Sequence, residues 1–378
     1  MSTIKVNTID NEGGAVDFPN KLTVRGNAIE RTYTSSGTEP SSPSEGDFWY
    51  DTGNDVLKHY INSEFKTVSF VPPSISWGGS RGIMAHGFTS GWVNSIDKFD
   101  ITTSGNATDF GDLTVARAPN PTGSSARCCF GGGMNSGPRS NVIDYITTST
   151  TGNATDFGDL TQNKSSMSTA SNGTRGLWFG GYVQGVTPTY ENTNIDYITI
   201  DTLGNASDFG DTTVGSNSGA GCSNDTYGLH AGGYGRINGS GTYKQNIDKV
   251  VIATTGNATD YGDLTKAKNV QGGASDKTRG LIGGGYDPSL NGGSRTNEIE
   301  YVTIATDGNG TDFGDLSVAR SCSAASHVTY AVFVAGEGTS GATNIIDRVT
   351  VQTLGNAADH GDLTNTSTRD GAWSGNAS

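Results

Sequence analysis

A decapeptide with paired carboxylates carries the residue types best suited to chemistry in this chain. It recurs six times with small variations, first as GNATDFGDLT from Gly105 and last as GNAADHGDLT from Gly355. Two carboxylates with an asparagine nearby can bind a hard cation such as Ca²⁺ through oxygen ligands. The paired aspartates are Asp109, Asp112, Asp156, Asp159, Asp208, Asp211, Asp260, Asp263, Asp312, Asp315, Asp359 and Asp362.

The same residue types also suit a structural turn. Asn and Asp side chains cap their own turns, and the aromatic residue of each copy would pack between neighbouring repeats. An active site is normally single and asymmetric, whereas this pattern occurs six times. We therefore interpret the decapeptide as a turn, with Ca²⁺ binding as the alternative, and we predict no catalytic residue, no metal site and no cofactor. The histidines show no metal-ligand spacing: His59, His86, His230, His327 and His360.

Three further segments accompany each decapeptide and predict strands. A small-residue segment ending in glycines, such as WFGGY from Trp178, comes first. An apolar strand with an embedded acid follows, and runs such as VARSCSAAS from Val318 come after the decapeptide. Four short strands in a unit of about 50 residues are typical of stacked repeats. The embedded acids are Asp97, Asp144, Asp196, Asp248, Glu300 and Asp347.

The two ends of the repeat region complement each other. The first repeat lacks the strand that precedes the glycine segment in the other repeats. The tail from Asn365 resembles that strand, with Ala372 and Ser374 in the places of Thr169 and Ser171. We therefore predict an all-β fold in which residues 74–378 form a six-bladed β-propeller, closed onto blade one by a C-terminal strand within residues 365–378. The blades end near residues 114, 161, 213, 265, 317 and 364.

The order of glycine doublet, acidic-aliphatic strand, aromatic turn and "LTVAR" resembles kelch-type propeller repeats over residues 76–378. The resemblance implies a fold and transmits no function. This chain departs from the kelch pattern because other residues replace its tryptophan: Phe110, Phe157, Phe209, Tyr261, Phe313 and His360.

The third, fourth and fifth repeats carry about five extra residues between the glycine segment and the acidic strand. Insertions at one point of each unit emerge on one face of a propeller. Tyr with Asn, Ser and Gly is typical of adaptable recognition loops, including loops that stack on sugar rings. We predict a ligand-binding rim here, with longer solvated hairpins as the alternative. Its candidate residues are Tyr182, Tyr190, Tyr234, Tyr243 and Tyr286.

Composition and net charge limit the classes of partner that the chain can bind. The formal net charge is −14, with 24 basic against 38 acidic residues, which disfavours nucleic acid. We find no apolar run long enough for membrane insertion and no signal-peptide pattern. We interpret the cysteines as reduced packing residues: Cys128, Cys129, Cys222 and Cys322.

Residues 1–73 lie outside the repeat, and we predict a small N-terminal β module there, ending in a proline linker at Val71–Pro73. Its segments IKVNTI, DFPNKLTV and the stretch from Pro43 to Asp51 resemble modules at the front of phage tail-fibre and other virion-surface proteins, particularly in phages of marine bacteria.

This resemblance implies a phage virion protein at the particle surface, a tail fibre or related appendage. Its N-terminal module would bind other virion proteins, and its propeller would bind a host cell-surface glycan or protein, or a neighbouring subunit. Two alternatives stay open, a capsid or tail decoration protein and a glycan-degrading propeller enzyme. We expect a homo-oligomer, because virion appendages are symmetric.

Overall fold

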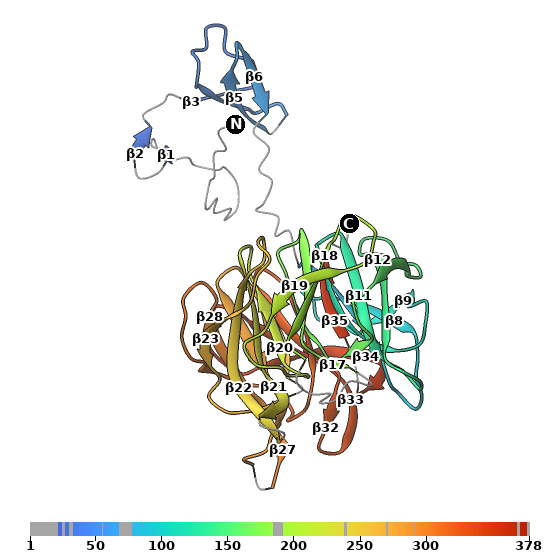
Figure 1. Ribbon diagram of the computed structural model, residues 1–378. Helices are drawn as coiled ribbons and strands as arrows, with labels where there is room; N and C mark the ends of the chain where they lie inside the picture. The colour runs from blue at the N-terminus through green and yellow to red at the C-terminus, as the bar shows by residue number, and fades with distance from the viewer. Residues whose placement is uncertain are drawn as a thin grey trace. The chain divides into compact units, whose positions relative to one another are not determined.

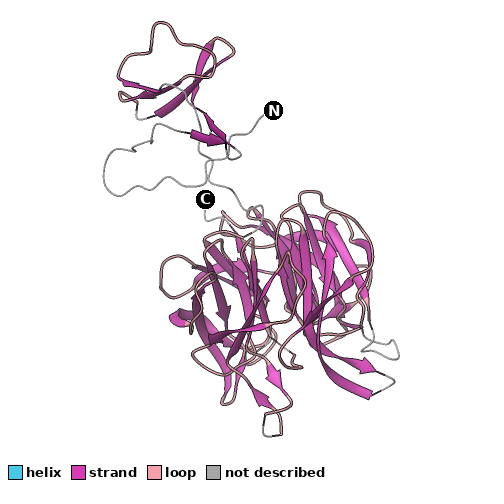
Figure 2. Ribbon diagram, turned by 90° about the vertical axis from the view of Figure 1, so that its left-hand side faces the viewer, coloured by secondary structure: helices cyan, strands magenta, loops and turns pink. Residues whose placement is uncertain are grey.

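The structure is a computed structural model in which the chain divides into two compact units, residues 1–74 and 75–378. Every described element is a strand, so the prediction of an all-β fold is confirmed (Figure 1; Figure 2). Among the described residues there is no helix of the length and apolar character needed to cross a membrane. The described residues are 22–24, 27–29, 33–54, 56–67, 78–183, 192–237, 240–269, 271–290, 292–368 and 371–375.

The first unit contains a short hairpin and a four-stranded sheet. In the sheet β3 runs parallel to β4, and the other neighbours are antiparallel. Trp49 is buried, donates its indole N–H to the Ser36 carbonyl at 3.0 Å and meets the Phe65 ring edge-on. The strands are β1 (Leu22–Val24), β2 (Asn27–Ile29), β3 (Tyr33–Ser36), β4 (Phe48–Asp51), β5 (Val56–Ile61) and β6 (Glu64–Thr67).

The described residues of the second unit form six antiparallel sheets with four main strands each. In chain order, the first three sheets are β35 (Gly371–Gly375), β7 (Arg81–Ala85), β8 (Ser95–Asp100) and β9 (Thr108–Asp112); β10 (Ala118–Gly123), β11 (Arg127–Met134), β12 (Ser140–Thr147) and β13 (Thr155–Asp159); and β15 (Ser168–Ser171), β16 (Arg175–Phe179), β18 (Asn194–Thr199) and β19 (Ser207–Asp211).

The last three sheets follow the same order, and the sixth carries the additional short strand β32 (Glu337–Gly338). Two short ladders lie beside the sheets, β14 (Lys164–Ser165) with β17 (Tyr182–Val183), and β26 (Tyr286–Asp287) with β27 (Ser294–Arg295). The sheets are β20 (Ala220–Ser223), β21 (Tyr227–Ile237), β22 (Ser240–Val251) and β23 (Thr259–Asp263); β24 (Gly272–Ser275), β25 (Arg279–Gly283), β28 (Glu298–Thr303) and β29 (Thr311–Asp315); and β30 (Ser323–Ser326), β31 (Tyr330–Val334), β33 (Gly341–Thr350) and β34 (Ala358–Ser367).

The C-terminal strand β35 belongs to the first sheet, where it pairs with β7. Figure 1 shows this red strand among the cyan and green strands of the first repeats. Ala372 lies opposite Met84. In the third sheet Thr169 lies opposite Trp178 in the same register. The tail therefore occupies the position that the first repeat leaves empty.

The first strand of each sheet, here called its inner strand, contacts the inner strands of two other sheets. The order of contact is β10, β15, β20, β24, β30, β35 and back to β10. Small residues permit this approach, because a Cβ atom on Gly221 would lie 2.0 Å from the Thr169 carbonyl oxygen. A Cβ atom on Gly273 would lie 2.2 Å from the Gly221 oxygen.

The core lies between neighbouring sheets. Phe110 of the first decapeptide is buried in a cluster with Ile83 of its own sheet and with Phe130 and Ile146 of the second sheet. The corresponding aromatic residues of the later copies are buried as well: Phe157, Phe209, Tyr261, Phe313 and His360. All four cysteines are buried free thiols, and burial raises the pKa of Cys222 to about 12. They are packing residues, as the sequence indicates.

Candidate functional site

The decapeptides run along the outer strands of the six sheets, β9, β13, β19, β23, β29 and β34. The first aspartate of each copy is exposed and the aromatic residue after it is buried. The asparagine does not cap its own turn as predicted. Asn153 Oδ1 instead accepts the backbone N–H of Asp112, in the preceding copy, at 3.1 Å. The outer strand of one sheet lies beside the Gly-Asn turn of the next, and the asparagine satisfies a backbone donor at that edge.

This contact recurs at every junction between consecutive copies, including the junction of the last with the first. The other five pairs of backbone donor and asparagine acceptor are Asp159 with Asn205, Asp211 with Asn257, Asp263 with Asn309, Asp315 with Asn356, and Asp362 with Asn106. Within the described ranges, no group of three or more His, Cys, Asp or Glu side chains is placed to hold a metal ion.

The embedded acids of the third strands lie at the interfaces between sheets. Asp144 is fully buried and accepts the Thr114 hydroxyl at 2.6 Å and the Arg117 guanidinium at 2.7 Å. Thr114 ends the preceding decapeptide, so the acid fastens the connection between two sheets. Backbone N–H groups at the ends of all six decapeptides make the same contact, from Thr114 to Asp144, Thr161 to Asp196, Thr213 to Asp248, Thr265 to Glu300, Ser317 to Asp347 and Thr364 to Asp97.

Four of these acids pair with a buried cation three residues beyond the decapeptide, which the sequence analysis did not single out. The signal was present, because a basic residue stands at the same offset in four repeats. The four pairs are Arg117 with Asp144, Lys164 with Asp196, Lys268 with Glu300, and Arg320 with Asp347.

Serine occupies the cation position in the other two repeats, and a histidine lies nearby in each. His86 Nε2 lies 2.9 Å from Asp97 where the last sheet meets the first. His230 lies between the Ser168 and Ser216 hydroxyls, at 2.6 Å and 2.7 Å. Burial lowers the pKa of His230, and the nearby Asp248 acts against that shift.

Ser168 and His230 place a serine hydroxyl beside an imidazole, which is the arrangement expected of a catalytic nucleophile and its base. Both side chains are almost completely buried, and His230 turns its second ring nitrogen to a serine in place of a carboxylate. Along β15 the burial pattern exposes Thr169 more than Ser168. A catalytic base is normally oriented by a third group such as a carboxylate, and His230 is held between two serine hydroxyls instead, so we assign this contact to packing between the third and fourth sheets.

Three of the five predicted rim residues lie together. Tyr234 meets Tyr243 edge-on, with ring centroids 5.1 Å apart, and Tyr243 stacks on Tyr286 at 5.5 Å. We call these three residues the tyrosine rim. The Tyr182 ring packs under the Arg139 guanidinium, and Tyr190 lies outside the described residues.

Local pairing explains this assembly. The long hairpin of β21 and β22 places Tyr234 opposite Tyr243, and the ladder of β26 and β27 places Tyr286 opposite Arg295. Burial raises the pKa of Tyr243, and the neighbouring Tyr286 and Tyr234 raise it further. The phenol is therefore neutral at physiological pH and available as a hydrogen-bond donor.

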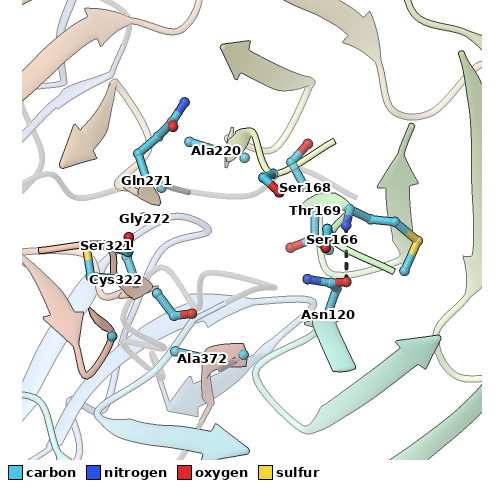
Figure 3. Close-up of a pocket in the computed structure, with 18 of the residues that line it drawn as sticks. Asn120, Ser166, Ser168, Thr169, Ala220, Gln271, Gly272, Ser321, Cys322 and Ala372 are labelled. Atoms are coloured by element: carbon cyan, nitrogen blue, oxygen red, sulfur yellow. Dashed lines mark hydrogen bonds between the residues drawn. The ribbon is translucent and has the colours of Figure 1, made fainter. Parts of the chain in front are cut away.

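A cavity of about 410 Å³ lies between the six inner strands. Figure 3 shows residues from different inner strands surrounding this space, among them Asn120, Thr169, Gly272 and Ala372. We call it the central cavity. Arg295 links the cavity wall to the rim, because it lines the cavity and its guanidinium lies 5.3 Å from the centre of the Tyr286 ring.

No family model matches this sequence, and no curated protein matches it.

Proposed function

We propose that residues 75–378 form a six-bladed, kelch-like β-propeller that β35 closes. Two circuits of contacts support this arrangement. The inner strands contact one another in a cycle of six, and the decapeptides are joined in a second cycle through their asparagines. A cyclic order of six equivalent four-stranded sheets is the pattern that a propeller requires.

We infer that this propeller is a binding module of a phage virion protein, a tail fibre or appendage, and not an enzyme. The observation that carries the inference is the tyrosine rim beside the central cavity. Neighbouring aromatic rings with phenol hydroxyls provide stacking area and hydrogen bonds at low entropic cost, which suits a host-surface glycan or protein. The N-terminal unit would bind other virion proteins. The second candidate is a capsid or tail decoration protein.

Adsorption to cells tests the rim. Fluorescently labelled full-length protein would be incubated with a panel of bacterial strains and with purified lipopolysaccharides. We expect Tyr243→Ala and Tyr286→Ala to reduce adsorption at least tenfold. Tyr182→Ala serves as the control, because the Tyr182 ring packs under the Arg139 guanidinium. Equal adsorption by all variants would overturn the assignment of the rim.

The location in the particle tests the virion assignment. Purified particles carrying the chain would be reconstructed by electron cryomicroscopy, and a six-bladed ring would be fitted to the density. Density at the distal end of a tail appendage supports host recognition. Density lying on the capsid or tail tube identifies a decoration protein, and absence from particles overturns the virion assignment.

A further inference from the structure

We propose that the central cavity binds one neutral sugar residue, the terminal residue of a glycan, which enters end-on from the tyrosine rim. This inference rests on the proposed binding function and names the class of ligand.

The size of the cavity favours a single ring. Its volume of about 410 Å³ falls near the lower end of the range for small-molecule sites, about 300–1,000 Å³. Beyond it lies a second space of about 30 Å³, also lined by Thr169, Gly221 and Ala324. That space has the volume of about one water molecule. A sugar ring would therefore stop at Thr169, and a longer chain would not thread between the sheets.

The cavity wall favours a neutral ligand. Its charged side chains, within the described part of the chain, are Arg295 and Glu337, and these two form an ion pair with each other. An anionic sugar would need a cation of its own, because burying an unpaired charge is costly. The chain's net negative charge of −14 further disfavours an acidic ligand.

The remaining wall favours a ligand rich in hydroxyl groups. Serine and threonine hydroxyls both donate and accept hydrogen bonds, so they match sugar hydroxyls without a charged partner. The glycines and alanines between them leave backbone N–H and C=O groups close to the space. The wall hydroxyls include those of Ser166, Ser168, Thr169, Ser218, Ser321 and Ser323.

The tyrosine rim extends the site outward. Arg295 belongs to the cavity wall and also lies over the Tyr286 ring, which stacks on Tyr243. A second sugar residue, leaving the cavity, would meet these rings, and aromatic faces stack on the apolar face of a sugar. The site would thus select the end of a glycan chain and hold its next residue at the rim.

Saturation-transfer NMR on the full-length protein tests the proposal. The probes are D-glucose, D-galactose, D-mannose, L-rhamnose and N-acetylglucosamine, with glucuronic acid and sialic acid as anionic comparisons. We expect transfer to at least one neutral sugar and none to the acids. Transfer to no neutral sugar, or equal transfer to the acids, would overturn the proposal.

Two variants place the signal in the cavity. Thr169→Phe fills the floor, and Ser323→Leu narrows the wall from another inner strand. We expect each to lower sugar affinity at least tenfold. Thr199→Phe, at an exposed position of β18, is the matched control and should bind as the parent does. If Thr169→Phe does not fold, as judged by its thermal transition, the sugar affinity of Ser323→Leu decides whether the cavity is the binding site. Unchanged affinity in a folded variant contradicts the proposal.

The two proposals fail separately. If the rim variants lose adsorption to cells while Thr169→Phe and Ser323→Leu keep both adsorption and sugar signals, the tyrosine rim binds and the cavity does not. If the rim variants adsorb normally while a neutral sugar still binds the cavity, the cavity assignment holds and the proposed function fails.

Discussion

Arg117 Nη1 lies 2.7 Å from Asp144 Oδ2, and both side chains are completely buried where the first sheet meets the second. The guanidinium also donates to the carbonyl oxygens of Gly132 and Phe130. It donates to the carbonyl oxygens of Val115 and Val142 as well, so one side chain neutralises a buried acid and satisfies four backbone acceptors. This combination explains how a chain with only 33% hydrophobic residues holds neighbouring sheets together.

Replacement of Arg117 by leucine should destabilise the second unit strongly. Removal of one partner of a buried ion pair costs about 3–5 kcal/mol, because the remaining charge loses its compensation. Urea unfolding followed by circular dichroism would measure the loss. Arg117→Lys is the matched control and should lose less, since Lys164 pairs with Asp196 at the next interface. If Arg117→Leu lowered the free energy of unfolding by less than about 0.5 kcal/mol, the size of an ordinary surface change, the stabilising role of Arg117 would be contradicted.

Removal of β35 should open the first sheet. Truncation after residue 370 exposes the edge of β7 and deletes the contacts of β35 with β10 and β30. We expect a loss of several kcal/mol, which lowers Tm by about 10 °C in a domain of this size. Differential scanning calorimetry provides the measurement, and truncation after residue 375 is the control. An unchanged Tm after truncation at residue 370 would show that β35 contributes no stability.

Substitution of Gly221 by alanine should disturb the inner strands. The added Cβ atom would lie 2.0 Å from the Thr169 carbonyl oxygen, so the strands must move apart. Overpacking of this kind costs about 1–3 kcal/mol. Gly152→Ala is the control, because nothing lies within 4 Å of a Cβ atom there. Equal urea midpoints for the two variants would show that close approach of the inner strands does not limit this position.

His360 should make stability depend on pH. It replaces the aromatic residue of the other decapeptides, and its ring bonds to the Asp100 carbonyl as the Tyr261 hydroxyl bonds to the Thr303 carbonyl. Burial lowers the pKa of His360 below its usual 6.5. The unfolded chain therefore binds a proton more readily, and stability is lost as the pH falls through 6.5.

His360→Tyr should keep the hydrogen bond and remove this titration. We expect the difference in urea midpoint between pH 7 and pH 5 to shrink relative to the parent. It should not vanish, because burial also lowers the pKa of His230 and His327. An unchanged difference would show that His360 does not contribute to the pH dependence.

The sequence by itself determined the strands, their number in each repeat and the position of β35. These features follow from short-range patterns, since alternating side chains, glycine doublets and turn residues act within a few positions of the chain. The burial of the decapeptide aromatics and of the cysteines followed for the same reason. Likewise, the match between the tail and the third repeat placed Ala372 at the position of Thr169, and the two residues pair in the same register, with Met84 and Trp178 respectively.

Only the tertiary structure decided which side chains meet across sheets. Asn153 caps a strand of the preceding copy, and Arg117 reaches an acid on a strand that is not adjacent in the chain. Tyr243 stacks on Tyr286, whereas Tyr182 packs under Arg139. The central cavity likewise exists only where inner strands from distant repeats approach one another. Such contacts depend on the neighbours and register of whole sheets, which no local pattern encodes.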